Sequence, residues 1–392
     1  MRIKTPVLIL GWFGKGNFGD DLLLRADLAI VRRIYSDRQI SVRLHGDPLR
    51  YCHRMVPGPR YLRFNGVTRA QGLAVLYGGG TQFFSFAPAP AQARNRRSRL
   101  RRFVYRAAAT VRNPRRLLRR PVTLEISPSV RVAGVSLGLG PFHDAGAEEL
   151  ARRRMSRCGF IWVRDRVSHD YCRQWGLNYA RLWPDLGYAP LLWGGADASA
   201  SRSDRLRQVG FVIQHWTHGP SGAAHLAASF RLARELVRRK LTVRFFTLMD
   251  RMDSPAADAA RAAGFDVLAY HPVRLSVRDF AARMCECDLI FSARAHGTIV
   301  SVSMGVPAVS MLISPKMAVT AESLGDVGYK WDQPFELGQA LELVTNIIDH
   351  YPAVRQATLR RSRENASLAA QGAQELERFL RAARAGTEYV AR

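Results

Sequence analysis

Short apolar runs alternate with helix-like patterns along this chain, and this alternation is the feature that most restricts its fold. A short apolar run bounded by turn residues is typical of a buried strand, and a longer amphipathic segment between two such runs is typical of a crossover helix. Repeated units of this kind build parallel sheets with helices on both faces, so we predict an α/β fold of doubly wound sheets. The candidate strands are Pro6 to Leu10, Ile40 to Leu44, Leu73 to Tyr77, Val130 to Val135, Phe160 to Val163, Ala180 to Trp183, Val209 to Gln214, Leu241 to Thr247, Asp266 to Ala269, Leu289 to Phe291 and Ala308 to Met311.

The length of 392 residues, 47% of them hydrophobic, is enough for two domains that each bury a core. Gly194 to Asp204 is rich in Gly, Ala, Ser and Asp and lacks apolar periodicity, so we place the join between the domains there. The prediction is an N-terminal Rossmann-like domain over residues 1–193, a C-terminal Rossmann-like domain over 205–350 and a helical segment over 351–392. The two domains would face each other across a cleft, and the terminal helix would return to brace the first domain.

The formal net charge is +27, and nearly all of the basic residues are Arg, because Lys occurs only at positions 4, 15, 240, 316 and 330. Part of this excess can reflect coding bias. The remainder favours anionic surroundings, such as phosphorylated substrates, acidic polysaccharide, nucleic acid or acidic lipid headgroups.

A segment over residues 93–120 is dense in Arg and contains no acidic residue. Its apolar residues recur at helical spacing, so one face would be apolar while its flanks are cationic. This pattern fits a helix that lies on an anionic membrane surface. It fits equally well a core helix whose basic face is exposed to solvent. Nucleic acid is a less favoured partner, because the run lacks the interleaved aromatic residues of a single-strand platform.

The five cysteines are odd in number, with no CxxC pair and no histidine spacing typical of zinc. This pattern fits a reducing cytoplasm. The apolar run Val7 to Leu10 is too short for a signal peptide, and no segment reaches the roughly 20 apolar residues of a membrane span. We therefore expect a cytoplasmic protein, with the Arg-rich segment as a candidate for peripheral attachment to the inner face of the cytoplasmic membrane.

The stretch Ser292 to Gly297, with sequence SARAHG, lies between an apolar run and a helix-like segment. Backbone N–H groups at a helix start and the positive end of the helix dipole favour an anion there. Arg294 adds donors matched to a carboxylate or phosphate, and His296 adds an imidazole that titrates near neutral pH. Arg294, His296 and Gly297 are therefore candidate site residues, although a solvated Arg and a core His would give the same pattern.

A glycine-rich turn follows the first candidate strand, and Gly14, Gly16 and Gly19 match GxGxxG. A dinucleotide site should also have an acidic residue roughly 20 residues further on. Asp47 is the nearest candidate and its register is poor, so we do not predict a dinucleotide site. The glycines instead indicate close approach of a ligand to a helix start. Gly19 and Asn17 would contact that ligand, and Asp20 would either cap the helix or accept a proton from a substrate hydroxyl.

Further polar or glycine-rich clusters follow other candidate strands, at the sheet edge where open α/β sheets bind ligands. Each glycine alone is more typical of a turn, and Arg164 beside Asp165 is equally typical of a local ion pair. The clusters are Gly78 to Thr81, which includes Gly79 and Gly80; Gly134 to Pro141; Arg164 to Ser168; Trp183 to Asp185; and Ser314 to Lys316. We expect them to converge on one crevice, with Asp185 as a facing carboxylate and Lys316 as a phosphate contact.

Taken in order, these motifs resemble the polysaccharide pyruvyl transferase family. The matching segments are GNFGDD at 16–21, YGGGTQ at 77–82, GVSLGLGPF at 134–142, VRDRVS at 163–168, WPDLGYAP at 183–190 and SARAHGTIVSVSMGVPAV at 292–309, followed by Lys316. The resemblance implies a two-domain fold like that of the GT-B glycosyltransferases, and a reaction in which phosphoenolpyruvate places a pyruvyl ketal on two hydroxyls of a sugar. It implies no metal and no cofactor beyond phosphoenolpyruvate as co-substrate. Carried onto this chain, Arg294 and His296 are donor-site residues, and Arg164 is a second candidate for the donor's charge.

The residue types suit that chemistry, because guanidinium groups can hold the carboxylate and phosphate of the donor. His296 is the expected general acid or base, and Asp185 or Asp20 are candidates for activating the acceptor hydroxyl. The acceptor would be a sugar of an exopolysaccharide or cell-surface polysaccharide, with a lipid-linked oligosaccharide as the natural form if the basic helix lies on a membrane.

Two other functions remain open at this point. A GT-B glycosyltransferase that uses a nucleotide sugar would share the fold and usually needs an acidic residue for the ribose hydroxyls, for which Glu322 is a candidate. A basic protein that binds polysaccharide without catalysis would share the charge. The sequence does not indicate the oligomeric state.

Overall fold

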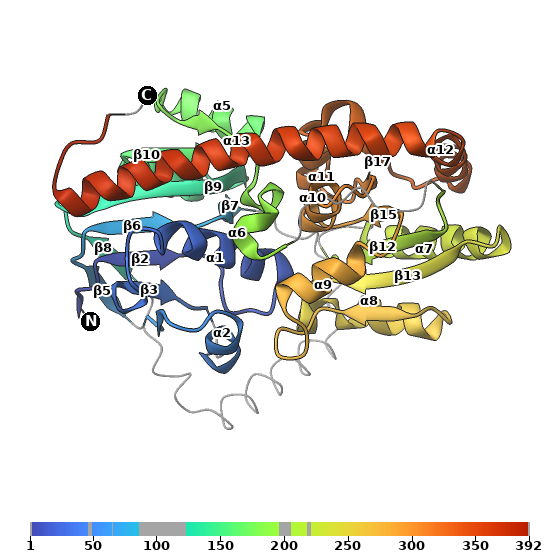
Figure 1. The fold of residues 1–392 in the computed structure, drawn as a ribbon, viewed down its shortest axis with the longest axis horizontal. Helices are drawn as coiled ribbons and strands as arrows, with labels where there is room; N and C mark the ends of the chain where they lie inside the picture. Colours follow the sequence, from blue (N-terminus) through green and yellow to red (C-terminus); the bar gives the residue numbers. More distant parts are fainter. Residues whose placement is uncertain are drawn as a thin grey trace.

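The computed structural model describes residues 2–45, 49–64, 66–85, 123–195, 205–217 and 221–390. The Arg-rich segment over 93–120, most of the expected join over 194–204 and Asp47 lie outside these residues. Two parallel sheets lie side by side, and one long helix passes over both of them (Figure 1).

The N-terminal sheet has the strand order β11-β10-β9-β6-β2-β3-β4, and β7 pairs with β9. The central strands are buried along their whole length, which is the pattern of a sheet covered on both faces. The strands are β2 (Val7–Leu10), β3 (Ile40–Arg43), β4 (Arg60–Leu62), β6 (Ala74–Tyr77), β7 (Gly80–Ser85), β9 (Arg131–Phe142), β10 (Phe160–Val163) and β11 (Arg181–Leu182). A smaller parallel sheet has the order β1 (Arg2–Ile3), β5 (Val67–Ala70) and β8 (Thr123–Ile126).

Helices connect these strands, and several begin at an Asn or Asp whose side chain accepts a backbone hydrogen bond from the first turn. Their bounds are α1 (Phe18–Val31), η1 (Asp37–Gln39), α2 (Leu49–Met55), α4 (Ala145–Met155), α5 (Arg166–Gln174), η3 (Leu186–Tyr188) and α6 (Pro190–Trp193).

The C-terminal sheet has the strand order β14-β13-β12-β15-β16-β17, and the pairings between these described strands are parallel. Its strands are β12 (Gln208–Ile213), β13 (Thr242–Thr247), β14 (Val267–Ala269), β15 (Leu289–Ser292), β16 (Ala308–Met311) and β17 (Tyr329–Trp331). Its helices are α7 (Ser221–Arg238), α8 (Asp250–Ala262), α9 (Val277–Met284), α10 (Ala295–Ser303), α11 (Pro315–Glu322), η4 (Gly325–Val327) and α12 (Leu337–Asp349).

The last helix, α13 (Tyr351–Ala385), starts on the C-terminal domain and ends on the N-terminal domain (Figure 1). Ser362 Oγ donates to the carbonyl of Ser303 in α10 at 2.8 Å, and further along the helix the carbonyl of Leu380 accepts from Tyr35 Oη at 3.1 Å. The helix therefore ties the two domains together.

The start of α1 is a second link between the domains. The amide of Phe18 donates to the carbonyl of Leu248 at 2.8 Å, and the Phe18 ring packs edge-on against Tyr270. Tyr270 Oη in turn donates to the buried carboxyl of Asp21 at 2.9 Å. The first turn of α1 is thus held by the C-terminal domain.

The predicted fold class is confirmed: the protein is α/β, with two Rossmann-like parallel sheets. The expectation of a glycine-rich loop over 134–141 is wrong, because β9 runs through it to Phe142. Glycine lets the strand pass close to other groups: a Cβ on Gly138 would lie 2.9 Å from Arg164 Nη2. A glycine run therefore marks a crowded central strand here rather than a turn.

The five cysteines are free and buried. Among the described residues, no helix has both the length and the apolar character to cross a membrane.

Candidate active site at the domain junction

The turn between β15 and α10 is built on Ser292. Its hydroxyl donates to the carbonyl of Arg294 at 2.7 Å and accepts from the amide of Arg294 at 3.2 Å, which fixes the start of the helix. A Cβ on Gly297 would lie 2.2 Å from Ser292 Oγ and 3.0 Å from Val212. Gly297 therefore lets α10 pack directly on the sheet, and its observed contacts are structural.

His296, in the first turn of α10, faces the N-terminal domain and is 8% exposed. Its Nδ1 edge lies against α1, where a Cβ on Gly19 would come within 2.1 Å of it. On the other edge, Nε2 lies 3.7 Å from Asp185 Oδ1, and it has no hydrogen-bonding partner within the described residues. His296 is therefore enclosed by both domains, with one ring nitrogen left without a partner.

Asp185 lies at the start of η3, is 2% exposed and caps that turn by accepting from the amide of Gly187 at 2.7 Å. Its other oxygen accepts from Arg164 Nη1 at 2.6 Å. Burial by itself raises the pKa of Asp185, but the charge of Arg164 and the attraction of His296 outweigh it and hold the pKa well below its usual range. Asp185 is therefore an anion at neutral pH, and it faces the His296 ring.

Arg164 is buried, and its guanidinium group contacts residues from three segments of the N-terminal domain. Besides Asp185 it binds Thr81 Oγ1, through Nη2 at 2.8 Å, while its Nε lies 3.8 Å from Asp165. The local pair with Asp165 is thus the weaker one, since Asp165 Oδ1 accepts from the amide of Ser168 and caps α5. Because each of its nitrogens faces a protein partner, Arg164 holds Asp185 in place.

Ser136, in the middle of β9, supports the same loop. It is fully buried with a φ of 51°, an uncommon conformation for a residue other than glycine, and its Oγ accepts from the amide of Leu186 at 3.0 Å. Backbone strain of this kind is typical of functional sites, and here it positions the residue next to Asp185.

Arg294 forms a bidentate ion pair with Asp253 of α8, with Nε at 3.0 Å and Nη2 at 2.5 Å from the two carboxylate oxygens. Asp253 is fully buried and also accepts from the amides of His215 and Met249. The Arg294 side chain is 19% exposed, so the pair fixes its orientation and leaves Nη1 for a ligand.

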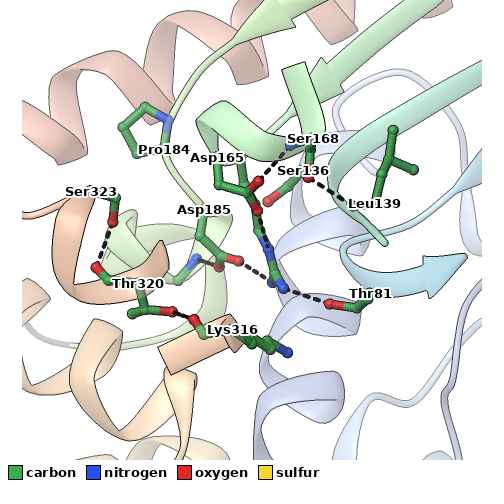
Figure 2. A network of polar contacts seen from close by, with 12 residues as sticks. Thr81, Ser136, Leu139, Asp165, Ser168, Pro184, Asp185, Lys316, Thr320 and Ser323 are labelled. Atoms are coloured by element: carbon green, nitrogen blue, oxygen red, sulfur yellow. Dashed lines mark hydrogen bonds and ion pairs between the residues drawn. The ribbon is translucent and has the colours of Figure 1, made fainter. Parts of the chain in front are cut away.

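Lys316 lies in the first turn of α11, and its side chain extends from that helix on the side where Asp185 and Thr81 lie (Figure 2). Its side chain reaches solvent, but protein atoms surround the ammonium group. This partial burial, together with the charges of Arg164 and Arg294, lowers the pKa of Lys316 to about 8, against the opposing attraction of Asp20 and Asp185. Lys316 is therefore a cation at neutral pH that lies among two carboxylates and two guanidinium groups.

Asn17, not Asp20, caps α1, which corrects that expectation for Asp20. Asn17 Oδ1 accepts from the amide of Gly19 at 3.2 Å, and Asn17 Nδ2 donates to Asp20 Oδ2 at 2.8 Å. Burial raises the pKa of Asp20, while His296 and Lys316 oppose the shift. Asp20 is therefore a half-buried carboxylate that interacts with both residues across the junction.

The turn at Gly79 and Gly80 lies beside Asp20 and is held by an acid that the sequence analysis missed. Gly80 has a φ of +108°, and a Cβ there would lie 3.6 Å from Asp20 Oδ1. The amide of Gly79 donates to Asp27 Oδ2 at 3.1 Å, and Asp27 Oδ1 has no partner within the described residues. Burial raises the pKa of Asp27 to about 8, so this side chain is mostly protonated at neutral pH.

The structure thus brings together Asp20, Asp185, His296, Arg164 and Lys316, whereas Gly297 and Gly79 are used in packing and turn formation. The sequence analysis missed Asp253 and Asp27. Asp27 interrupts the apolar face of α1, which is a usable signal, but nothing local to Asp253 links it to Arg294. No cluster of three or more His, Cys, Asp or Glu side chains suited to a metal is present in the described part of the chain.

Comparison with known structures shows the fold. HepE of Anabaena in complex with UDP and glucose has a TM-score of 0.54 at 12% identity and covers 97% of this chain and 100% of its own. A putative UDP-N-acetylglucosamine 2-epimerase from Listeria monocytogenes has a TM-score of 0.55 at 11% identity, with 99% of each chain covered. MnaA of S. aureus with UDP has a TM-score of 0.56 at 10% identity, covering 97% of this chain and 96% of its own. The fold is accordingly of the GT-B type.

Sequence comparison is more specific. No curated protein matches the chain, but the family model for polysaccharide pyruvyl transferase matches residues 17–315. That range starts at Asn17, the cap of α1, and ends at Pro315, next to Lys316, so it contains both sides of the junction. On this evidence the chain belongs to the polysaccharide pyruvyl transferase family.

Proposed function

We propose that the protein transfers the pyruvyl group of phosphoenolpyruvate to two hydroxyls of a sugar, forming a ketal, in the synthesis of an exopolysaccharide or cell-surface polysaccharide. The observation that carries the proposal is the position of His296, with Asp185 on one edge, α1 with Asp20 on the other side and Lys316 nearby. An acid–base group between carboxylates and a cation suits a reaction that moves protons next to a strongly anionic donor.

The donor would be held from the C-terminal domain. Lys316 supplies a charge for the phosphate, and Arg294, fixed by Asp253, presents Nη1 to the carboxylate. The amides at the start of α10 add the positive end of a helix dipole. No metal is needed for this arrangement, and phosphoenolpyruvate enters as a co-substrate.

The proposed chemistry uses His296 as the acid. His296, as imidazolium, would donate its proton to the methylene carbon of the donor, while one sugar hydroxyl adds to the neighbouring carbon. The second hydroxyl then adds as the C–O bond to phosphate breaks. Of the two hydroxyl protons, one restores His296 and the other leaves with inorganic phosphate, so the products are the ketal and phosphate.

The carboxylates fit different roles in this scheme. Asp185, whose pKa is lowered, is a poor base and is placed to stabilise the imidazolium. Asp20, whose pKa is raised, is the better candidate to accept a proton from the acceptor hydroxyl. The acceptor would approach the N-terminal side of the junction, near Asn17, Gly19 and Gly80.

The acceptor is proposed to be a sugar, and a lipid-linked oligosaccharide if the segment over 93–120 lies on an anionic membrane surface. The proposed location is the cytoplasm, with peripheral attachment to the membrane through that segment. A flotation assay with anionic and neutral vesicles tests this part, because a basic amphipathic helix should bind only the anionic ones at low salt.

A nucleotide-sugar glycosyltransferase remains the second candidate, because structures with this fold include HepE in complex with UDP-glucose. Its expected acidic residue, Glu322, lies at the end of α11, is 64% exposed at its side chain and faces Lys330 at 3.8 Å. The structure thus gives Glu322 a surface partner.

Thermal unfolding with each donor separates these functions. A ligand present at about 100 times its Kd stabilises a protein by about 2.7 kcal/mol, so phosphoenolpyruvate should raise the Tm by several degrees and UDP-glucose should not. His296→Ala should retain this shift but release phosphate from phosphoenolpyruvate at a strongly reduced rate in the presence of acceptor. A Tm rise with UDP-glucose and none with phosphoenolpyruvate would overturn the proposal.

A further inference from the structure

A second concave surface lies away from the domain junction, on the seam between the N-terminal domain and α13. It has a volume of about 550 Å³ and is bordered by α5, β11 and the C-terminal half of α13. This volume is within the range of small-ligand sites. We propose that this groove binds a sugar unit of the polysaccharide other than the one being modified, an inference that rests on the proposed function for the identity of the polymer.

Three amide side chains share the polar part of the groove with His169, Arg181, Glu375 and Arg378. Asn178, Gln371 and Gln374 line it, and their amides make no hydrogen bond to the described part of the chain. Each amide offers donors and an acceptor in one plane. Neighbouring hydroxyls on a sugar ring also donate and accept, so the three amides match a saccharide, and the charge of Arg378 is already met by Glu375.

An aromatic residue supplies the apolar part. Trp183 lines the groove and is half-buried, with its ring stacked on Phe160 at a centroid distance of 6.2 Å and edge-on to Trp162 at 5.8 Å. Its carbonyl accepts from Trp162 Nε1 at 3.0 Å, so both ring and backbone are fixed. Such a rigid apolar surface suits the C–H face of a sugar ring, and beside it Leu182 is 46% exposed.

The helix that carries the glutamines is also fixed. A Cβ on Gly372 would lie 2.9 Å from the Trp162 ring, so α13 packs directly against the domain at this point. Gln371 and Gln374 are three residues apart and therefore share one helix face. Next to them, Arg378 forms an ion pair with Glu375 at 2.6 Å, which adds a charged rim. The Trp183 ring and the backbone of α13 are thus preorganised, which lowers the entropic cost of binding, while the side chains of Gln371 and Gln374 are exposed.

The groove is linked directly to the candidate active site. Trp183 is two residues before Asp185, and Pro184 between them restricts the backbone. A polymer held at Trp183 would therefore be bound to the loop that carries Asp185, which raises the local concentration of its other sugar units near the junction.

The test is binding of neutral sugars to the full-length protein without phosphoenolpyruvate, measured by saturation-transfer NMR. The probes are the methyl glycosides of glucose, galactose and mannose and a hexasaccharide of each, with inorganic phosphate as an anion control. The variant is Gln371→Ala with Gln374→Ala, and the control is Gln356→Ala, an exposed glutamine 15 residues before Gln371 on the same helix. Two lost hydrogen bonds should weaken binding of at least one hexasaccharide by about tenfold in the double variant and not in the control.

The outcomes are distinct. Absence of transfer to every sugar by the wild-type protein, or equal transfer by the double variant, overturns the proposal, as does binding of phosphate alone. Because this measurement needs no turnover, it is independent of whether phosphoenolpyruvate is the donor. Where transfer is active, the double variant should lower kcat/KM for a polymeric acceptor and leave the value for a monosaccharide unchanged.

Discussion

His296 Nε2 and Asp185 Oδ1 lie 3.7 Å apart, although they belong to different domains. The distance is slightly longer than a hydrogen bond, and a small closing movement of the domains would form one. The carboxylate is already fixed by Arg164 and the amide of Gly187, so the imidazole is the partner that would move. This pair therefore forms only when both domains are in place, which suits the proposed reaction because that reaction must exclude water.

Asp185→Asn should lower kcat by about 10²- to 10⁴-fold, because the imidazolium loses its facing charge. If Asp185 acts through His296, adding Asp185→Asn to His296→Ala should cause no further loss, since residues that act as a unit are not additive. Single-turnover phosphate release measures both. Asp170→Asn, an exposed residue of α5, is the control. If Asp185→Asn lowers kcat by the same factor in the His296→Ala background as in the wild type, Asp185 acts independently of His296.

Gly19→Ala should abolish activity while the fold is retained. The new methyl group would meet His296 Nδ1 at 2.1 Å, so the imidazole must leave its position or the domains must move apart. Gly338→Ala in α12 is the matched control, because nothing lies within 4 Å of its Cβ position. That control should gain about 0.5–1 kcal/mol from helix propensity and keep full activity. Wild-type rates in Gly19→Ala would place the reaction away from His296.

Lys316 gives the activity a limit at alkaline pH. Since its pKa is about 8, the side chain loses its charge as the pH rises through that value, and the KM for the donor should then rise. Lys316→Arg keeps the charge and should remove this increase, while Lys316→Ala should have a high KM at every pH. Donor KM measured from pH 6 to 10 checks this, with Lys330→Ala, a residue facing Glu322, as control. A KM that stays flat in the wild type across this range would contradict the assignment.

Asp27 should make the protein less stable as the pH rises. The pKa of Asp27 is about 8 in the folded state, and the reference value is 3.8. The contribution of Asp27 to the free energy of unfolding is therefore fully present below about pH 4 and is lost as the pH rises from about 4 to about 8. Asp27→Asn keeps the acceptor for the amide of Gly79 and cannot ionise, so the free energy of unfolding should depend less on pH. At pH 7 the variant should be more stable than the wild type by a few kcal/mol, since each pH unit counts for about 1.4 kcal/mol. Denaturant unfolding from pH 4 to 8 measures the slope. The exposed Asp326→Asn is the control, and an unchanged slope in Asp27→Asn would show that the carboxyl is ionised.

Arg294→Lys should reduce activity strongly, although the substitution keeps the positive charge. A lysine cannot make the bidentate contact to Asp253, so the buried carboxylate loses a partner and Nη1 is no longer presented to the donor. We expect a Tm decrease corresponding to about 1–3 kcal/mol and a higher KM for phosphoenolpyruvate. Arg244→Lys, on the surface beside Asp266 and Glu286, controls for the chemical change. Retained KM in Arg294→Lys would remove Arg294 from the donor site.

The strands were predictable from the sequence because a short apolar run between turn residues is a local signal. Phe160 to Val163 and Ala308 to Met311 have the predicted bounds in the structure. The glycine-rich part of β9 was wrongly expected to be a loop. Two of its glycines make room for side chains from elsewhere in the chain, Arg164 at Gly138 and Tyr171 at Gly140, and the local sequence does not show this.

The sequence by itself therefore determined the fold class, the family and the segments that end at the junction, since each depends on residues close together in the chain. Tertiary structure alone decided the partners: Arg164 holds Asp185 rather than Asp165, Arg294 is bound to Asp253, and His296 faces Asp185. These pairs join residues 21 to 111 positions apart, and their formation depends on how the two sheets pack and on how burial changes the energy of each charge. No local pattern contains that information.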